Sequence, residues 1–527
     1  MDIIEKEKKK RTILYGLLVT VLVLIGVTYA YYRITKTQTN SNVIGTRTCL
    51  NTTLTEETSE IVLSDAFPIS DEDGLKQSPF TFTLTNNCDS YVKVTIALVS
   101  EYRTSTNTAY LKDNYVKSNL STKGTNDGSS VILSTLSLGE VDTNTQGYVL
   151  KTTGLKNKEA KSFDLRLWLD SETTNEQGLN KTWKGKIVVS VVAAEYVPTF
   201  AETILANNEV KAPITTPGAA ISTADEAEFA STEDDYGTSY YFRGAVTNNY
   251  VEFANKCWRI VRVGGDGSVK LILHNDNTAG VANPCDSANN SASAAFARYS
   301  GTTYKSAFNT NYNDNAYVGF KFGTVGSSTY EATHANTNNS TILTNLEAWY
   351  NNNDNFKKYE KVIADTVWCN DKTNVTDTSY DPWSITPNGL GYAKNVTYYG
   401  ATKRLLSADN KAGGTGPSLK CNGELSKINS KVGLITADEL ALAGYAAGTG
   451  NTTTYLQENA TDTYWWSLSP NSFDGVGAGV WLVHGSNGGF GNGGVNGTRG
   501  VRPSISLKST TNITGEGTSS TPYIISM

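Results

Sequence analysis

Residues 12–32, TILYGLLVTVLVLIGVTYAYY, constrain this chain most because they contain no charged side chain. At about 1.5 Å per residue, a helix of this length spans roughly the 30 Å of hydrocarbon in a bilayer. Basic residues lie just before it, at position 6 and over 8–11. Because such a cluster stays cytoplasmic, we predict a cytoplasmic basic stub over 1–11, a single transmembrane helix over 12–32 and an extracellular remainder.

The same segment also fits a signal peptide, which is the alternative to a retained anchor. Small residues in Thr28-Tyr29-Ala30 suit cleavage after export. We favour retention at the cell membrane. Both alternatives predict that the bulk of the chain lies outside the cell.

The number and spacing of the cysteines also indicate an exported protein. They are widely spaced, and none forms the CxxC pair that is typical of zinc sites. The simplest pairing joins neighbours in the sequence, although many other connectivities and free buried thiols are alternatives. The predicted disulfides are Cys49 with Cys88, Cys257 with Cys285, and Cys369 with Cys421.

Length and charge narrow the classes of protein that remain. A chain of 527 residues favours several domains. The net charge of −6 gives no basic field for gathering phosphates. We therefore expect no nucleic-acid partner.

Alternation of apolar and polar residues dominates the range 45–194. Phe80, Phe82 and Leu84 alternate with threonines over 79–85, as in a strand that is buried on one face. The same alternation recurs over 91–99, 162–169 and 184–193. We predict an all-β sandwich that serves as a stalk, with a ligand-binding sandwich as the alternative.

The remaining chain is predicted to hold a linker and an α+β domain. Residues 195–240 contain a capping box, Thr199 to Glu202, and then an Ala-, Thr- and acid-rich stretch, which indicates a linker with a short helix. Residues 241–527 mix strand-like and helical segments. These are a glycine-rich hairpin near 264–267, helices over 340–353 and after the capping box Thr436 to Glu439, and strands over 464–470, 479–484 and 501–507.

A series of motifs in this second region resembles a known family. The order is CWRIVRV, LEAWY, VIADTVWCND, KVGLITADEL, WWSLSP and GVRPSISL. It resembles exported proteins of Gram-positive gut bacteria whose C-terminal domain has no assigned role. The tryptophan-rich strand, Gly/Asn loop and GVRP strand are similar to C-type-lectin-like domains related to formylglycine-generating enzymes. The preceding sandwich loosely resembles the camelysin type.

The resemblance implies a scaffold rather than the activities of these relatives. Formylglycine-generating enzymes use a pair of cysteines near the C-terminus, and no cysteine follows Cys421. The EPN or QPD and WND motifs of calcium-dependent lectins are missing as well. We therefore expect no enzymatic activity, catalytic residue, cofactor or metal.

The glycine-rich loop 484–497 is the predicted recognition element. Gly489, Gly491 and Gly494 have the spacing of a dinucleotide-binding loop, but a strand rather than a helix follows them. Aromatic and amide side chains on a glycine backbone are typical of adaptable binding loops, and a long polar turn without a ligand is the alternative. The candidate ligand-binding residues are Trp481, His484, Asn487, Phe490, Asn492 and Asn496.

Other candidate chemistry is sparse. The three histidines are far apart in the sequence and give no metal-ligand spacing. Asp365 and Asp371 are the strongest candidates for the carboxylate pair of a hydrolase, but solvated loop acids are the favoured interpretation. Arg502 is expected to pair with a buried carboxylate.

The sequence thus predicts a single-pass cell-surface binding protein, an adhesin or receptor for an unknown protein or glycan ligand. A structural subunit of the cell surface and an extracellular hydrolase are the alternatives.

Overall fold

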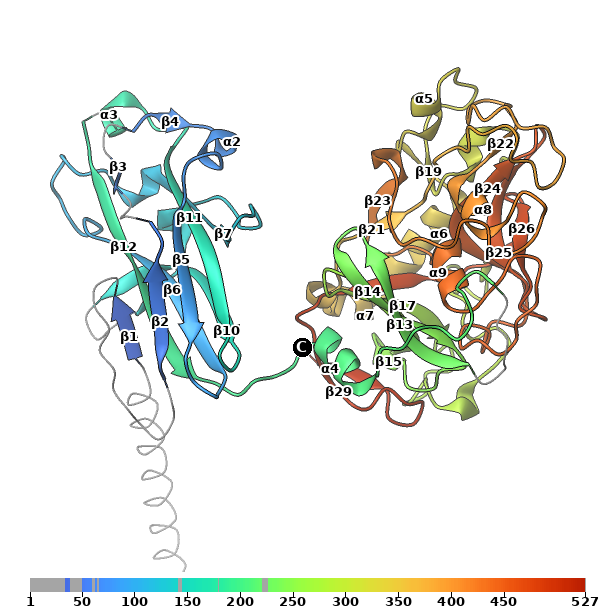
Figure 1. The fold of residues 1–527 in the computed structure, drawn as a ribbon, viewed down its shortest axis with the longest axis horizontal. Helices are drawn as coiled ribbons and strands as arrows, with labels where there is room; N and C mark the ends of the chain where they lie inside the picture. The colour runs from blue at the N-terminus through green and yellow to red at the C-terminus, as the bar shows by residue number, and fades with distance from the viewer. Residues whose placement is uncertain are drawn as a thin grey trace, which may run out of the picture. The chain divides into compact units, whose positions relative to one another are not determined.

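The computed structural model describes residues 34–37, 50–58, 62–63, 66–140, 145–178, 180–219 and 226–526. The chain divides into two compact units, Met1–Val197 (unit 1) and Pro198–Met527 (unit 2), and most regular structure in both is β-sheet (Figure 1). The predicted stub over 1–11 and membrane helix over 12–32 lie outside the described residues. Within the described ranges, no helix combines the length and apolar character needed to cross a bilayer.

Unit 1 contains two sheets among its described residues. The first has the strand order β1-β12-β6-β10-β9, with β3 paired to β12, and the second has the order β2-β5-β11-β7-β8, with β4 paired to β11. The first comprises β1 (Ile34–Thr37), β3 (Val62–Leu63), β6 (Val92–Ser100), β9 (Leu138–Glu140), β10 (Gln146–Leu155) and β12 (Trp183–Ala193). The second comprises β2 (Thr52–Glu56), β4 (Pro68–Ile69), β5 (Phe80–Asn86), β7 (Val116–Thr122), β8 (Val131–Ile132) and β11 (Ala160–Asp170). Short helical turns join them: α2 (Asp71–Gly74), η1 (Asp113–Tyr115), η2 (Leu133–Thr135) and α3 (Asn175–Gly178).

One apolar core lies between these two sheets. Phe82 of β5 and Leu165 of β11 come from one sheet, and Ile96 of β6 and Val189 of β12 come from the other. All four side chains are buried in the same cluster, as the alternating pattern of their strands predicts. Unit 1 is therefore a β-sandwich.

Unit 2 is built on two larger sheets. The first has the path β13-β14-β16-β15-β30-β29, with β17 joining β16 to β28, and the second has the path β18-β27-β24-β25-β26, with β22 paired to β24. The first comprises β13 (Ala227–Asp234), β14 (Gly237–Gly244), β15 (Tyr250–Phe253), β16 (Lys256–Val263), β17 (Val269–Asn275), β28 (Ser504–Leu507), β29 (Asn512–Thr514) and β30 (Tyr523–Ser526). The second comprises β18 (Lys305–Ser306), β22 (Thr397–Tyr398), β24 (Trp465–Phe473), β25 (Ala478–Val483), β26 (Phe490–Gly494) and β27 (Arg499–Gly500).

Short helices and two-stranded ribbons complete unit 2. The ribbons are β19 (Lys321–Phe322) with β20 (Asn338–Asn339), and β21 (Thr366–Cys369) with β23 (Lys427–Ser430). The α-helices are α4 (Phe200–Asn207), α5 (Tyr330–His334), α6 (Thr341–Asn351), α7 (Asp354–Lys358), α8 (Gly400–Leu405) and α9 (Ala437–Leu442). The 3₁₀ turns are η3 (Ser287–Asn289), η4 (Asn315–Val318), η5 (Glu360–Val362) and η6 (Glu424–Ser426).

Both predicted capping boxes begin helices. The Thr199 hydroxyl accepts from the Glu202 backbone N–H at the start of α4, and Thr436 does the same for Glu439 at the start of α9. Each box satisfies backbone donors that a helix N-terminus otherwise leaves free. The local sequence therefore fixes the first turn of both helices.

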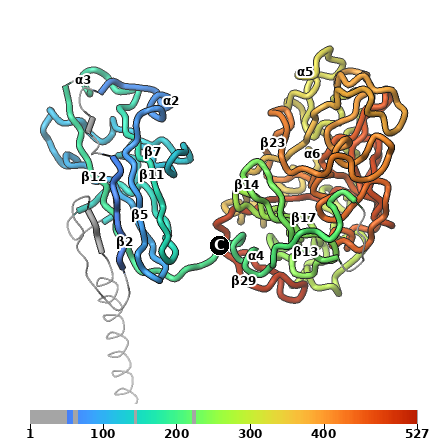
Figure 2. Tube along the Cα trace, viewed as in Figure 1, coloured from blue at the N-terminus to red at the C-terminus, as the bar shows by residue number. Residues whose placement is uncertain are grey.

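Most of the range 195–240 belongs to unit 2. Phe200 of α4 is buried, and its backbone N–H donates to Thr511 O, close to β29. Figures 1 and 2 show α4 beside β29, although these segments lie at opposite ends of the unit's sequence. Since β13 pairs with β14 in the large sheet, unit 2 begins at Pro198 rather than at residue 241 as predicted.

Two of the predicted disulfides are confirmed. Cys257 is joined to Cys285, with Cα atoms 5.0 Å apart, and Cys369 is joined to Cys421, with Cα atoms 5.5 Å apart. The predicted pair of Cys49 with Cys88 cannot be followed because Cys49 lies outside the described residues. Both confirmed bonds lie within unit 2.

Candidate functional site

The predicted recognition loop is largely a β-hairpin. Strands β25 and β26 pair with Val483 opposite Phe490 and Trp481 opposite Asn492. Trp481 is 1% exposed and Phe490 is 2% exposed, and their ring centroids lie 4.8 Å apart inside the core of unit 2. Because the hairpin packs against that core, both aromatic residues are structural. This corrects the prediction that they contact a ligand.

The other four predicted ligand-binding residues lie at the surface of the hairpin. His484 is half-buried, and its ring stacks on Tyr464 with centroids 4.0 Å apart. Burial, and then the charge of Arg499, lower the pKa of His484. Asn487, Asn492 and Asn496 are exposed, so these four residues stay predictions.

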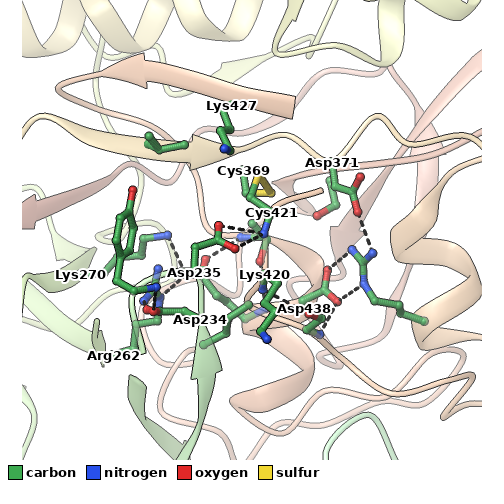
Figure 3. A pocket seen from close by; sticks show the side chains of 18 residues that line it. Asp234, Asp235, Arg262, Lys270, Cys369, Asp371, Lys420, Cys421, Lys427 and Asp438 are labelled. Atoms are coloured by element: carbon green, nitrogen blue, oxygen red, sulfur yellow. Dashed lines mark hydrogen bonds and ion pairs between the residues drawn. A yellow bond between two sulfur atoms is a disulfide. The ribbon is translucent and has the colours of Figure 1, made fainter. Parts of the chain in front are cut away.

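A hollow with far more charge lies elsewhere in unit 2. Its volume is about 250 Å³, and Figure 3 shows acids and bases converging on it. We call it the charged pocket and define it by its lining residues. They are Asp234, Asp235, Tyr236, Arg262, Lys270, Val367, Cys369, Asp371, Arg404, Ser418, Leu419, Lys420, Cys421, Lys427, Thr436, Asp438, Glu439 and Ser469.

Glu439 anchors one side of the charged pocket. Its Oε1 accepts from Lys270 Nζ at 2.6 Å and from Arg262 Nε at 2.9 Å. Its Oε2 accepts from the backbone N–H of Thr436 at 2.9 Å, which completes the capping box of α9. Burial alone would raise the pKa of this carboxyl, but the two cations and the capping bond hold it at about 2. Glu439 is therefore an anion at neutral pH.

Arg404 of α8 anchors the other side. Its Nε and Nη2 donate to the two oxygens of Asp438 at 2.6 and 2.9 Å, and its Nη1 donates to Asp371 Oδ2 at 2.7 Å. Two-point pairing of this kind fixes both charge and orientation. The two carboxylates raise the pKa of Arg404.

The end of β13 and the turn that follows it supply two more acidic groups. Asp234 Oδ2 accepts from Arg262 Nη1 at 2.9 Å and from the Gly265 N–H at 3.0 Å. The neighbouring Asp235 is exposed, and its carboxylate accepts from the Cys421 N–H at 3.1 Å. The Cys369–Cys421 disulfide thus places the segment around Lys420 at the rim of the charged pocket (Figure 3).

Several cationic donors of the charged pocket keep unused hydrogen-bonding capacity among the described residues. Arg262 donates through Nε and Nη1, whereas its Nη2 makes no hydrogen bond within these ranges. Lys270 Nζ has one hydrogen-bond acceptor there, Glu439 Oε1, and lies 4.9 Å from the Trp368 ring centre. Lys420 is exposed, without an ion pair to any described residue. Such donors can bind an acidic group that enters the hollow.

The sequence identified only fragments of this site. The capping box drew attention to Glu439, and the cysteine pairing joined Cys369 to Cys421. Arg262, Lys270 and Arg404 carried no local signal, because strand and helix positions far apart in the chain bring them together. Their partners could be found only from the fold.

Asp365 and Asp371, the suggested carboxylate pair of a hydrolase, have different surroundings and different cationic partners. Asp365 is exposed and pairs with Lys431 at 2.8 Å, whereas Asp371 is buried and pairs with Arg404. Within the described ranges, no group of three or more His, Cys, Asp or Glu residues is arranged to hold a metal ion.

Arg502 differs from its prediction as well. Its guanidinium donates to the backbone oxygens of Leu273 and Leu456 and lies 4.9 Å from the Trp465 ring centre. It has no carboxylate partner among the described residues. Backbone carbonyls and an aromatic face therefore take the place of the expected acid. Burial lowers the pKa of Arg502 to about 10.

Comparisons with family models, curated proteins and solved structures find no match to this chain. Its function is therefore argued from the geometry of unit 2.

Proposed function

We propose that this chain is a cell-surface binding protein, an adhesin or receptor, whose unit 2 captures a carboxylate-bearing group in the charged pocket. One observation supports this proposal above all. Arg262 and Lys270 lie at the wall of a hollow of about 250 Å³, and each has N–H groups that donate to no described residue. A guanidinium and an ammonium at this depth suit a carboxylate, which accepts several charge-assisted hydrogen bonds. The group would be presented by a protein or glycan.

The energetics of the ion pairs support a role in recognition. Asp438, Glu439 and Asp371 are each at most 3% exposed at the side chain and are paired with Lys or Arg. Burying such charges costs desolvation energy, and the attraction between the paired charges often only offsets this cost. A contribution to stability is therefore a weak explanation for these ion pairs. A preorganised set of charges around a hollow is, by contrast, an effective device for selecting a partner.

Binding is favoured over catalysis by the protonation states in the charged pocket. With a pKa of about 2, Glu439 has no proton to donate at neutral pH. The ion pairs with Asp438 and Asp371 raise the pKa of Arg404, so this guanidinium stays protonated as well. There are two alternatives. A general acid elsewhere in the chain would favour an extracellular hydrolase, and self-association of the chain would favour a structural subunit.

The proposed location of the chain is the outer face of the cell membrane. The uncharged segment 12–32 would anchor the chain with its N-terminus in the cytoplasm, and the sandwich of unit 1 would act as a stalk. The disulfides of unit 2 suit an oxidising exterior. Unit 2 would be the C-type-lectin-like head. The half-buried His484 and the exposed Asn487, Asn492 and Asn496 would extend the contact with the partner.

The test is a titration of the full-length chain with succinate, glutamate and galacturonate, each compared with its neutral amide or ester. We expect saturable binding of the carboxylates only, weakened about fivefold or more by Lys420→Ala. Lys357→Ala is the matched control, because Lys357 is an exposed lysine of α7 paired with Asp354. Absence of binding, or equal effects of the two variants, would contradict the proposal.

A further inference from the structure

The charged pocket contains one carboxylate without a cationic partner among the described residues. Its lining includes five acids. Four of them pair with an arginine or lysine of the same lining, and these are Asp234, Asp371, Asp438 and Glu439. The fifth is Asp235, whose two oxygens accept from the backbone N–H of Cys421 at 3.3 and 3.1 Å. The negative charge of Asp235 is therefore not balanced by an ion pair within the described ranges.

Asp235 is accessible to a ligand. It follows the last residue of β13, and it is exposed. Figure 3 shows its carboxylate beside Cys421, among the charged side chains of the hollow. Lys427, a basic residue of the same lining, pairs instead with Glu424 at 2.7 Å. Because carboxylate oxygens have lone pairs beyond the bond from Cys421, Asp235 can accept from a cationic group that enters the hollow.

The same hollow offers a free donor of the opposite charge close by. The Arg262 side chain is 17% exposed, and its Nη2 donates to no described residue. Its Nη1 donates to Asp234 Oδ2 at 2.9 Å, and Asp235 follows directly in the chain, with Cα atoms about 3.8 Å apart. The ion pair with Asp234 thus places a free cationic donor and a free anionic acceptor in one small site.

An aromatic residue lies next to this free carboxylate in the chain. Tyr236 is 64% exposed and lines the same hollow. Aromatic faces attract alkylammonium groups through the negative charge of the ring face. The turn after β13 therefore presents a carboxylate and an aromatic ring at consecutive positions, a combination that suits an ammonium group.

We propose that the charged pocket selects a zwitterion, a ligand that carries an ammonium group near its carboxylate, as an amino acid does. This inference rests on the proposed function, in which Arg262 and Lys270 bind the carboxylate. Asp235 accepts from the ammonium group, and the Tyr236 ring contacts it. A zwitterion leaves the balance of five acidic and five basic lining residues unchanged, whereas a simple carboxylate adds a negative charge that nothing offsets.

The decisive comparison is between glutamate and glutarate, which differ only in the ammonium group. Calorimetric titration of the full-length chain should show that glutamate binds about fivefold more tightly, because it adds one charge-assisted contact at a partly exposed site. Equal affinity for the two ligands would overturn this inference and leave the proposed carboxylate site intact. Binding of neither ligand would overturn both.

The variant Asp235→Asn tests the assigned acceptor. Its amide oxygen can still accept from the Cys421 N–H, so the turn keeps its contact. Glutamate affinity should fall to that of glutarate, whereas glutarate affinity should stay equal or rise, because a negative charge is removed. Asp474→Asn is the matched control, since Asp474 is exposed, lies outside the charged pocket and also accepts from backbone N–H groups. Equal losses for both ligands in Asp235→Asn, or the same effect in Asp474→Asn, would overturn this inference.

A further arm identifies the source of the zwitterion. Alanine and Nε-acetyl-lysine carry the same ammonium and carboxylate groups, but the second carries them at the end of a long neutral chain. Binding of both would show that a larger molecule can present the zwitterion to the pocket. Binding of alanine alone would show that the ligand is a free amino acid. Both outcomes support the inference, provided that Asp235→Asn abolishes the advantage over the matching acids without an ammonium group.

Discussion

The Nζ atom of Lys270 lies 2.6 Å from Oε1 of Glu439, which joins strand β17 to helix α9 across 169 positions of sequence. Arg262 donates to the same oxygen. One capping residue thus binds two cations, the buried Lys270 and the half-buried Arg262, at the wall of the charged pocket. The folding of α9 and the electrostatics of the candidate site depend on the same carboxylate.

Replacing Lys270 tests how much this pair contributes to stability. Lys270→Met should lower the free energy of unfolding by about 3 kcal/mol, because it removes one partner of a buried carboxylate. Tryptophan fluorescence in guanidinium measures this, since most tryptophans lie in unit 2. The double variant Lys270→Met/Glu439→Gln should lose less than the sum of the single variants. Strict additivity would show that the two side chains are not coupled.

The depressed pKa of Glu439 predicts how stability responds to acid. Its ordinary pKa of 4.5 falls to about 2 in the folded protein. The resulting stabilisation, about 3 kcal/mol, is present in full above the ordinary pKa and disappears as the pH falls toward 2. Unfolding measured between pH 6 and 2 in steps of about one unit should show this loss in wild type. A Glu439→Gln variant with an equally steep acid dependence would assign the loss to other groups.

The two confirmed disulfides should differ in their effect on binding. On the chain-entropy model, removing Cys257–Cys285, with a separation of 28 residues, costs about 3.5 kcal/mol, and removing Cys369–Cys421, with a separation of 52, costs about 4 kcal/mol. Only the second bond lines the charged pocket. Alanine replacement of Cys369 and Cys421 should therefore also weaken carboxylate binding, measured at a temperature where both variants are folded. If the variant without Cys257–Cys285 and the variant without Cys369–Cys421 bind carboxylates equally well, the charged pocket is not the carboxylate site.

The hairpin residues should separate into structural and surface groups. Trp481→Ala should lower stability by about 3–5 kcal/mol, because it leaves a cavity beside Phe490. Asn487→Ala and Asn496→Ala should change the melting temperature little, since both side chains are exposed. Differential scanning calorimetry of the three variants provides the comparison. A small shift for Trp481→Ala would mean that its ring is not part of the core.

Local patterns in the sequence predicted much of the secondary structure. The alternation of Phe80, Phe82 and Leu84 gave a strand with these residues buried, and the capping boxes at Thr199 and Thr436 gave helix starts. These features depend on residues that are neighbours in the chain, so short windows contain the necessary information. The pairing of Cys257 with Cys285 followed from proximity in the same way.

The recognition residues are harder to predict, because a high glycine content is typical both of exposed loops and of closely packed strands. Glycines at 491, 493 and 494 lie in strand β26 rather than in a free loop. An added Cβ at Gly493 would lie 2.6 Å from the Leu482 side chain. Close packing against β25 therefore explains at least one glycine that had suggested an adaptable loop.

The sequence by itself determined the uncharged segment at 12–32, the alternating strands of the sandwich and the starts of α4 and α9, because each depends on neighbouring side chains. Only the tertiary structure decided that Trp481 and Phe490 face the core and that Lys270 meets Glu439. It likewise decided that the guanidinium of Arg502 meets backbone carbonyls rather than an acid. Burial and charge pairing depend on which distant strands and helices pack together, and no short stretch of sequence contains that information.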